Sequence, residues 1–437
     1  MPIRQIPNTN QNYYLLIYDN NGRERPADDG RLLSQIVLQE ISNRSVGDIF
    51  IMSHGWLGDI PSAISQYDQW MSNFLGCAAD IESMKQKRPE STPLLIGMHW
   101  PSKPFGDENM GGSFNLDADA TGADPIKTAV EQQLELLNAP AEIRPHLETI
   151  FAAYAELDSP EALPPEVESA YREIDRVLAV GDDERLAFDP EAIFQNALEA
   201  EQEEQSFGSF GKFGFGDLLA PLRALSFWQM KDRARSFGET GAHQLLRAMQ
   251  QAAAGRDLRF HLMGHSFGCI VVSAMTAGAP GVNDLLSPVN SMMLVQGALS
   301  LWAYCPSLPS DRGKAGYFHS LIKNGRVKGP IVTTQSEHDS AVGLFYPLGA
   351  GIKRQVDFAL RLPTFGAIGS YGIQGMDDRI EGVTMGGAGH QYNFQPGKIY
   401  NLESSDVIKH EVIGAGAHSD IVHPEIAHAW WQAALVL

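Results

Sequence analysis

Apolar residues in this 437-residue chain gather in short continuous runs, separated by stretches in which they recur every three or four positions. The short runs predict buried strands, and the periodic stretches predict helices. We expect strands at 13–18, 48–52, 93–100, 258–263, 291–298, 329–335 and 398–402. We expect helices at 28–41, 62–85, 225–253 (with a break near Phe237 and Gly238) and 424–437. Buried strands that alternate with helices are typical of an α/β fold, a mostly parallel sheet covered by helices on both faces.

A long helical interruption separates the strand at 93–100 from the helix that starts near 225. Its helices are expected at 125–137, 141–157, 165–180 and 190–205, and three of them open on a proline, which a first helical turn accepts. We therefore expect 1–102 to form the first part of the core and 103–223 a helical insertion. Residues 224–437 complete the core and contain a second, Gly-rich insertion at about 348–397.

The helical insertion carries most of the net charge of −20, because 103–215 holds 25 acidic and seven basic residues. Nucleic acid is excluded as a partner, since phosphate binding requires a basic surface. Two interpretations of this acidic segment stay open: a lid over an active site, or a docking module for a protein partner. The run 207–216 alternates Phe with Gly, and its rings either cover the site or pack the insertion onto the core.

The remaining composition describes an ordinary globular chain, with 43% apolar and 20% charged residues. No apolar run is long enough to span a membrane, and residues 1–5 lack the apolar core of a secretory signal. Three cysteines are too few for a disulfide scaffold and favour a reducing compartment. We expect a cytoplasmic protein; its oligomeric state is not determined by the sequence.

The segment Gly264-His265-Ser266-Phe267-Gly268 has the form of a nucleophile elbow. In such an elbow a strand enters a sharp turn that raises one serine above the sheet, and a helix follows at once. An apolar strand precedes this segment, and a run of small apolar residues follows it. Ser266 is therefore the candidate nucleophile.

In these motifs and their order the chain resembles the α/β-hydrolase superfamily over residues 48–437, apart from the two insertions. The motifs are His54-Gly55 after an early strand, the elbow, Asp339 after a later strand, and His418 after the last one. The order Ser, Asp, His is the order that such hydrolases use. The resemblance implies an α/β-hydrolase fold and a serine hydrolase.

The serine hydroxyl needs a base, for which His418 is the first choice, and the imidazole needs a carboxylate, for which Asp339 is the first choice. The resemblance places them there, after the last strand and after the strand at 329–335. The rivals are Glu337 for the acid and His390, His410, His423 and His428 for the base.

Backbone N–H groups of Phe267 and Trp56 are expected to form an oxyanion hole, and His54, Gly55 and His265 to contact the substrate. The alternative for His54 and Trp56 is an ordinary turn with an indole packed on the core.

No metal and no organic cofactor is expected. His418, Asp420, His423 and His428 cluster in the sequence, but their spacing matches no standard ligand set. The predicted function is hydrolysis of a small-molecule carboxylic ester, with an apolar acyl group, through a Ser-His-Asp triad and an acyl-enzyme. A thioesterase, a lipid acyl hydrolase, a peptidase and a non-catalytic binding protein of the same fold stay open as alternatives.

Overall fold

The computed structural model describes residues 3–27, 29–43, 46–56, 60–89, 91–102, 124–137, 139–157, 160–178, 188–206, 218–282, 284–339, 362–364, 366–376, 378–410 and 416–436. The Phe/Gly run at 207–216 and much of the Gly-rich insertion lie outside these ranges. The strands are β1 (Ile3–Gln5), β2 (Asn12–Ile17), β3 (Val46–Ser53), β4 (Thr92–His99), β5 (Arg259–His265), β6 (Ser291–Val295), β7 (Ile331–Gln335), β8 (Ile380–Thr384) and β9 (Ile399–Glu403). The helices are α1 (Leu33–Asn43), α2 (Ile60–Gly76), α3 (Ala78–Lys87), α4 (Pro125–Leu137), α5 (Arg144–Glu156), α6 (Pro165–Leu178), α7 (Pro190–Ser206), α8 (Ala220–Phe237), α9 (His243–Ala252), α10 (Gly268–Ala277), α11 (His319–Lys323), α13 (Ile368–Tyr371) and α14 (Pro424–Ala434), with short η1 (Ala141–Ile143) and η2 (Gly238–Ala242).

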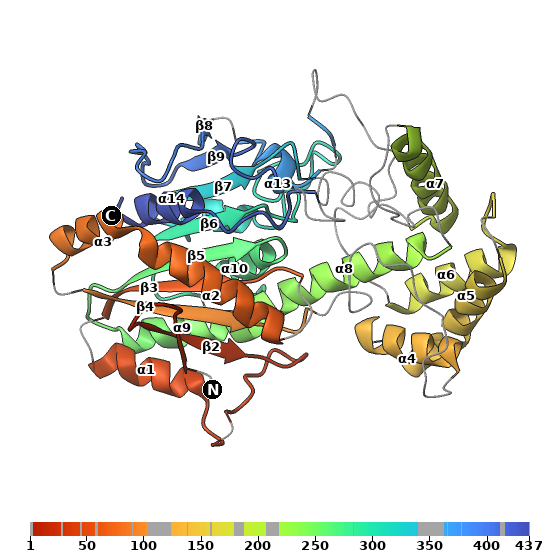
Figure 1. Ribbon diagram of the computed structural model, residues 1–437, viewed down its shortest axis with the longest axis horizontal. Coiled ribbons are helices and arrows are strands. Elements are labelled where there is room, and N and C mark those ends of the chain that lie inside the picture. The colour runs from red at the N-terminus through yellow and green to blue at the C-terminus, as the bar shows by residue number, and fades with distance from the viewer. Residues whose placement is uncertain are drawn as a thin grey trace.

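Within the described residues, nine strands form one sheet in the order β1-β2-β4-β3-β5-β6-β7-β9-β8 (Figure 1). The pairing of β1 with β2 is antiparallel, and every other pairing is parallel. The predicted α/β class with a mostly parallel sheet is confirmed. Because parallel strands run the same way, their carboxyl ends meet at one edge of the sheet, and loops that leave that edge come together.

Helices cover both faces of the sheet (Figure 1). In β3, Ile49 and Ile51 belong to the core under α1, α8, α9 and α10, whereas Phe50 and Met52 belong to the core under α2 and α14. Neighbouring side chains of a strand point to opposite faces, so a strand buried on both faces must be apolar throughout. This is the physical reason that continuous apolar runs indicated the central strands.

Helices α4 to α7 form a separate helical group beyond one end of the sheet (Figure 1). They have an apolar core of their own, to which the first half of α8 contributes Leu222 and Leu225. Later in the same helix, Trp228 and Phe237 belong to the core against the sheet. Helix α8 therefore joins the two bodies, and residue 223, expected as a boundary, lies inside it.

The structure differs from the expected elements at several points. One expected helix at 62–85 is two, α2 and α3, because the backbone at Cys77 leaves the helical region (φ −78°, ψ 66°). The expected break near Gly238 is a π-helical turn, η2, that lets the chain continue into α9. A Cβ at Gly238 would lie 2.5 Å from the Cβ of Ala274, so only glycine allows η2 and α10 to pack this closely. The edge strands β1 and β8 were not predicted, and β8 lies within the expected Gly-rich insertion.

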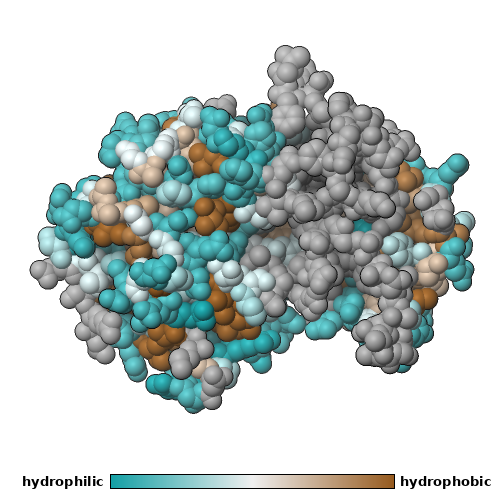
Figure 2. Space-filling view, viewed as in Figure 1, coloured by the Kyte–Doolittle hydropathy of each residue, from teal (hydrophilic) through white to brown (hydrophobic). Residues whose placement is uncertain are grey.

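The face of the molecule in Figure 2 is mostly hydrophilic over its described residues, with small separate apolar patches. None of the helices in the described ranges combines the length and the apolar composition needed to cross a bilayer.

A buried polar network ties the amino ends of the central strands together. Asp48 in β3 is 1% exposed and accepts hydrogen bonds from Arg88 (3.0 Å) and Ser91 (2.7 Å). It also contacts His261 of β5 at 3.2 Å, and His261 reaches Ser291 of β6 at 2.8 Å. Burial opposes ionisation of Asp48, but its contact with His261, the Ser91 hydrogen bond and the Arg88 charge hold its pKa below the ordinary value of 3.8.

We expect Asp48→Asn to lower the free energy of unfolding by about 2–4 kcal/mol, because it removes the charge partner of a largely buried Arg88. Asp257→Asn is the matched control: Asp257 contacts the same guanidinium at 3.0 Å but its side chain is 81% exposed, so the cost should stay under about 0.5 kcal/mol. Urea titration at neutral pH measures both. Since the folded pKa of Asp48 is depressed, its contribution is present above pH 3.8 and is lost as the pH falls below it. Equal costs for the two variants would contradict this account.

Candidate active site

Ser266 lies in a strained turn between β5 and α10. Its φ is +54°, in the left-handed region that residues other than glycine rarely adopt. Neighbouring backbone holds it there: the Ser266 N–H donates to the carbonyl of Val295 (3.1 Å), and the Ala298 N–H donates to the carbonyl of Ser266 (3.3 Å). A strand, a serine with strained backbone and an immediate helix therefore follow one another at this point.

Three glycines make this turn possible. A Cβ at Gly264 would lie 2.3 Å from the carbonyl oxygen of Gly268, and a Cβ at Gly268 would lie 2.2 Å from that of Ser53. A Cβ at Gly55 would lie 2.5 Å from the Cβ of Ser266. All three distances are shorter than any real contact allows, so helix α10, strand β5 and the loop after β3 pack together only because these residues lack side chains.

A hydrogen-bonded chain links Ser266, His418 and Asp339. The Ser266 Oγ is 2.8 Å from His418 Nε2, and His418 Nδ1 is 2.8 Å from Asp339 Oδ2. An ionised carboxylate only accepts, so Nδ1–H donates to Asp339, and Nε2 is left to accept the Ser266 hydroxyl proton. All three residues are at least nine-tenths buried. They follow the carboxyl ends of β5, β9 and β7, which the sheet brings to one edge.

Gln296, which the sequence analysis did not single out, holds the carboxylate of Asp339. Its Nε2 donates to Asp339 Oδ2 (2.8 Å) and to the carbonyl of Gly369 (3.1 Å). The orientation of the amide follows from Thr334, whose hydroxyl accepts the Gln296 N–H (2.9 Å) and must therefore donate to Oε1 (2.8 Å). The side chain is fully buried, and every polar atom of the amide has a partner.

Gln296 occupies on β6 the position that Ser266 occupies on β5. His265 and Val295 are paired in register, and Ser266 and Gln296 follow them directly. Apart from Asn8, they are the only non-glycine residues with positive φ in the described ranges, with Gln296 at +43°. Strain of this kind costs about 1–3 kcal/mol per residue and concentrates at functional sites. In the sequence, Gln296 could have been noticed as a glutamine followed by a glycine at the end of an apolar run.

The loop after β3 lies against Ser266, but His54 faces away into the protein. Its Nδ1 donates to the carbonyl of Gly55 (2.8 Å), so Nε2 accepts from Nδ1 of His99 (2.9 Å). Burial and the neighbouring His99 lower the pKa of His54 to about 3, so the ring is neutral at physiological pH. Both ring nitrogens are used, and the structure places His54 as a support for the loop.

His265 supports the loop that carries His418. Its Nε2 donates to the carbonyl oxygen of His418 at 3.0 Å. Burial and the nearby His418 hold the pKa of His265 well below its usual range. Its Nδ1 is buried without a hydrogen-bond partner in the described part of the chain.

Trp56 and Phe267 lie on the two sides of the turn, with their rings 5.9 Å apart. Among the described residues, no hydrogen bond uses the backbone N–H of either one. The Phe267 ring also contacts Phe227 of α8 at 5.1 Å. Within the described residues, therefore, two backbone donors without a hydrogen-bond partner lie on the two segments that meet at Ser266, together with their aromatic rings.

The rival residues lie elsewhere. Glu337 is exposed, and its backbone N–H is bonded to Ser405. His428 contacts Asp80 (2.6 Å) and the backbone carbonyl of His390. The residue His390 is exposed.

His410 and His423, the other two candidates for the base, lie together with Asp420 in a separate group. His418 and His428 are not part of that group, because each is bonded elsewhere.

We expect Gly268→Ala to destabilise the protein by about 1–3 kcal/mol or more, because its Cβ would press on two backbone carbonyls that cannot move independently. Gly382→Ala in β8 is the control, since nothing lies within 4 Å of its Cβ position and its φ is not positive. Chemical denaturation compares the two. If both alanine variants were as stable as the parent, the close packing of α10 on β3 would be refuted.

Compared with known proteins, the chain matches no family model, no curated protein and no solved structure. What this site does must therefore be argued from its own geometry.

Proposed function

We propose that this protein is a serine hydrolase of the α/β-hydrolase type that cleaves a carboxylic ester through an acyl-enzyme. The observation that carries the proposal is the hydrogen-bonded chain from Ser266 through His418 to Asp339, with the serine in a strained turn between strand and helix. Buried serine, imidazole and carboxylate groups in this order are what nucleophilic acyl transfer requires.

Three further features support an α/β-hydrolase. The serine, the acid and the histidine follow one another along the chain in the order that this superfamily uses. The serine follows a central strand, and the loop after β3 lies against it, as Gly55 shows by its approach to Ser266. In such hydrolases this loop and the residue after the nucleophile supply the oxyanion hole.

In the first half of the reaction, Ser266 Oγ attacks the ester carbonyl carbon as His418 Nε2 takes the hydroxyl proton. Asp339 keeps the imidazole in the tautomer with Nδ1–H and stabilises the cation that forms. The charge on the carbonyl oxygen is met by the N–H groups of Phe267 and Trp56. The carbon–oxygen bond to the alcohol then breaks, and the alcohol leaves with the proton from His418.

In the second half, water attacks the acyl-enzyme. His418 takes a proton from the water, and the second tetrahedral intermediate uses the same N–H groups. The bond to Ser266 breaks, Oγ recovers the proton from His418, and the carboxylic acid leaves. The cycle restores the starting hydrogen-bonded chain.

The partly buried ring of Trp56, 5.9 Å from the Phe267 ring, favours an ester with an apolar acyl group, whereas the rings of Phe267 and Phe227 are buried in the core. The contact of Phe227 with Phe267 also favours a lid over an independent docking module. Helix α8 packs with α4 to α7 at one end, so a movement of that group would be transmitted to the residue after Ser266.

We expect a fluorophosphonate probe to label the protein covalently at Ser266. Ser266→Ala should abolish labelling because the nucleophile is gone, and His418→Gln should do so because the hydroxyl loses its base. Ser287→Ala, at an exposed serine, should label like the parent. Gel fluorescence and mass spectrometry of the labelled peptide give the result. A parent protein that stays unlabelled, or a Ser266→Ala variant that labels fully, would refute the proposal.

Gln296→Met should lower kcat about 10- to 100-fold with little change in KM. It removes a hydrogen bond to the Asp339 carboxylate, which is worth about 1.5–3 kcal/mol, and each 1.36 kcal/mol corresponds to a factor of ten in rate. Gln395→Met is the control, because within the described residues the side-chain amide of Gln395 bonds Asn393 at the surface and lies apart from Asp339. Ester hydrolysis kinetics measure the effect, and an unchanged kcat in Gln296→Met would show that Asp339 needs no such support.

A further inference from the structure

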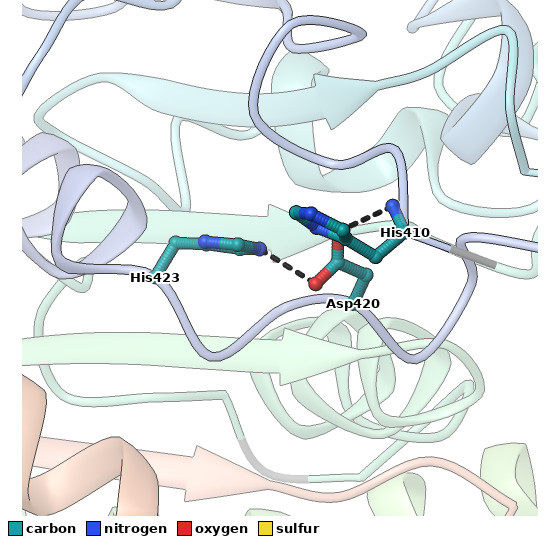
Figure 3. A group of neighbouring side chains, drawn as sticks. All are labelled: His410, Asp420 and His423. Carbon is teal, nitrogen blue, oxygen red and sulfur yellow. Dashed lines mark hydrogen bonds and ion pairs between the residues drawn. The ribbon is translucent and has the colours of Figure 1, made fainter. Parts of the chain in front are cut away.

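A second cluster of chemically active side chains lies on the loops after β9, apart from the Ser266 chain. It consists of His410, Asp420 and His423, the last being the residue before α14 (Figure 3). Both imidazoles approach one carboxylate: Asp420 Oδ1 is 2.8 Å from His423 Nε2, and Asp420 Oδ2 is 3.1 Å from His410 Nδ1. One atom from each residue lies within 4.8 Å of the other two.

From this geometry we propose that His410, Asp420 and His423 bind a divalent transition-metal ion of the zinc type. Two imidazoles and one carboxylate form an N₂O donor set, which suits Zn²⁺. At metal–ligand distances of about 2.0–2.2 Å, tetrahedral ligands lie about 3.3 Å apart. Each imidazole nitrogen is about that far from an Asp420 oxygen, and the three ligand atoms lie within 4.8 Å of one another, so an ion requires the side chains to rotate toward a common point.

The surroundings of Asp420 are those of a ligating carboxylate. The backbone N–H groups of Lys409 (2.9 Å) and His410 (2.8 Å) donate to Oδ2, which fixes the carboxylate and leaves Oδ1 toward His423. The backbone thereby holds the carboxylate in one orientation, as the hydrogen-bonded carboxylate of a metal site is held.

The exposure of the three residues gives an ion a path to the site. The His410 side chain is 73% exposed, whereas those of Asp420 and His423 are 15% and 20% exposed. Two ligands are thus held in place, and the third closes the site from the solvent side. Three protein ligands leave a fourth position for water.

The cluster brackets His418 in the sequence, because one ligand precedes it and two follow it. An ion would cross-link the two sides of the loop that carries His418 and would stabilise the folded state by mass action. The sequence analysis did not predict this site. It grouped Asp420 and His423 with His418 and His428, but the ring of His418 contacts Ser266 and that of His428 contacts Asp80. The missing ligand was His410, ten residues before Asp420.

The test is Zn²⁺ binding to untagged full-length protein, measured by equilibrium dialysis with elemental analysis, and repeated with Co²⁺, whose visible absorption reports the donor set. We expect one Zn²⁺ per chain, a melting temperature that rises with Zn²⁺ concentration, and Co²⁺ bands typical of tetrahedral nitrogen and oxygen ligands. Asp420→Asn and His423→Gln should each weaken binding by at least about tenfold. His410→Gln, an exposed position where folding is not at risk, should weaken it likewise.

His146→Gln, on a distant helix, should bind as the parent does. Ser266→Ala should also bind Zn²⁺ normally, so the metal site and the hydrolase proposal are tested separately. A stoichiometry well below one, or binding that His410→Gln and His423→Gln leave unchanged, would overturn the proposal and leave the cluster as an ion-paired group that holds the loop.

Discussion

The close packing of α10 on β5 and on the end of β3 is the constraint on which the rest of the site depends. The backbone at Gly264 and Gly268 is so near to its neighbours that no Cβ fits at either place. This proximity forces the chain to reverse within one residue, and that residue is Ser266, at φ +54°. The serine oxygen is thus held by the backbone of two strands and a helix, and its direction does not depend on side-chain packing alone.

The same constraint is repeated on the next strand. Gln296 leaves β6 with a positive φ at the register position of Ser266, and its amide bonds the acid that follows β7. Three adjacent strand ends therefore position one hydrogen-bonded chain: β5 carries the serine, β6 the amide that holds the acid, and β7 the acid. The histidine arrives from β9 and is fixed through its own backbone carbonyl by His265. Each group is held by a neighbour from a different strand, so an error in one strand end would displace the whole chain.

The sequence predicted those strands and helices whose pattern of apolar residues matches the side chains that are buried in the structure. Strand β3 is apolar on both faces, and its alternate residues lie in two different cores, so the continuous run was informative. At the sheet edge β8 is mostly exposed and contains Gly382, so no apolar pattern marked it. Ser266, Asp339 and His418 were named from their motifs and from the resemblance to α/β-hydrolases, and the parallel sheet brings the ends of their strands to one edge. The role of Gln296 was not predicted, because only its tertiary contacts distinguish it from a strand residue. The break at Cys77 was not predicted either, because the helical pattern continues on both sides of it.

Two buried sets of serine, histidine and aspartate lie in the described part of the chain, and their differences explain why only one is an active-site candidate. At the amino ends of the strands, Asp48 contacts His261, and His261 contacts Ser291. Ser291 lies within a regular strand and is fully buried, and Arg88 already supplies the positive charge that Asp48 requires. Burial lowers the pKa of His261 despite the opposing effect of the Asp48 carboxylate. At the opposite edge the serine is lifted out of the strand by its left-handed turn, and within the described residues the nearby N–H groups of Trp56 and Phe267 have no hydrogen-bond partner. Three residue types are therefore no site by themselves; the backbone strain and the strand end are what make Ser266 a candidate.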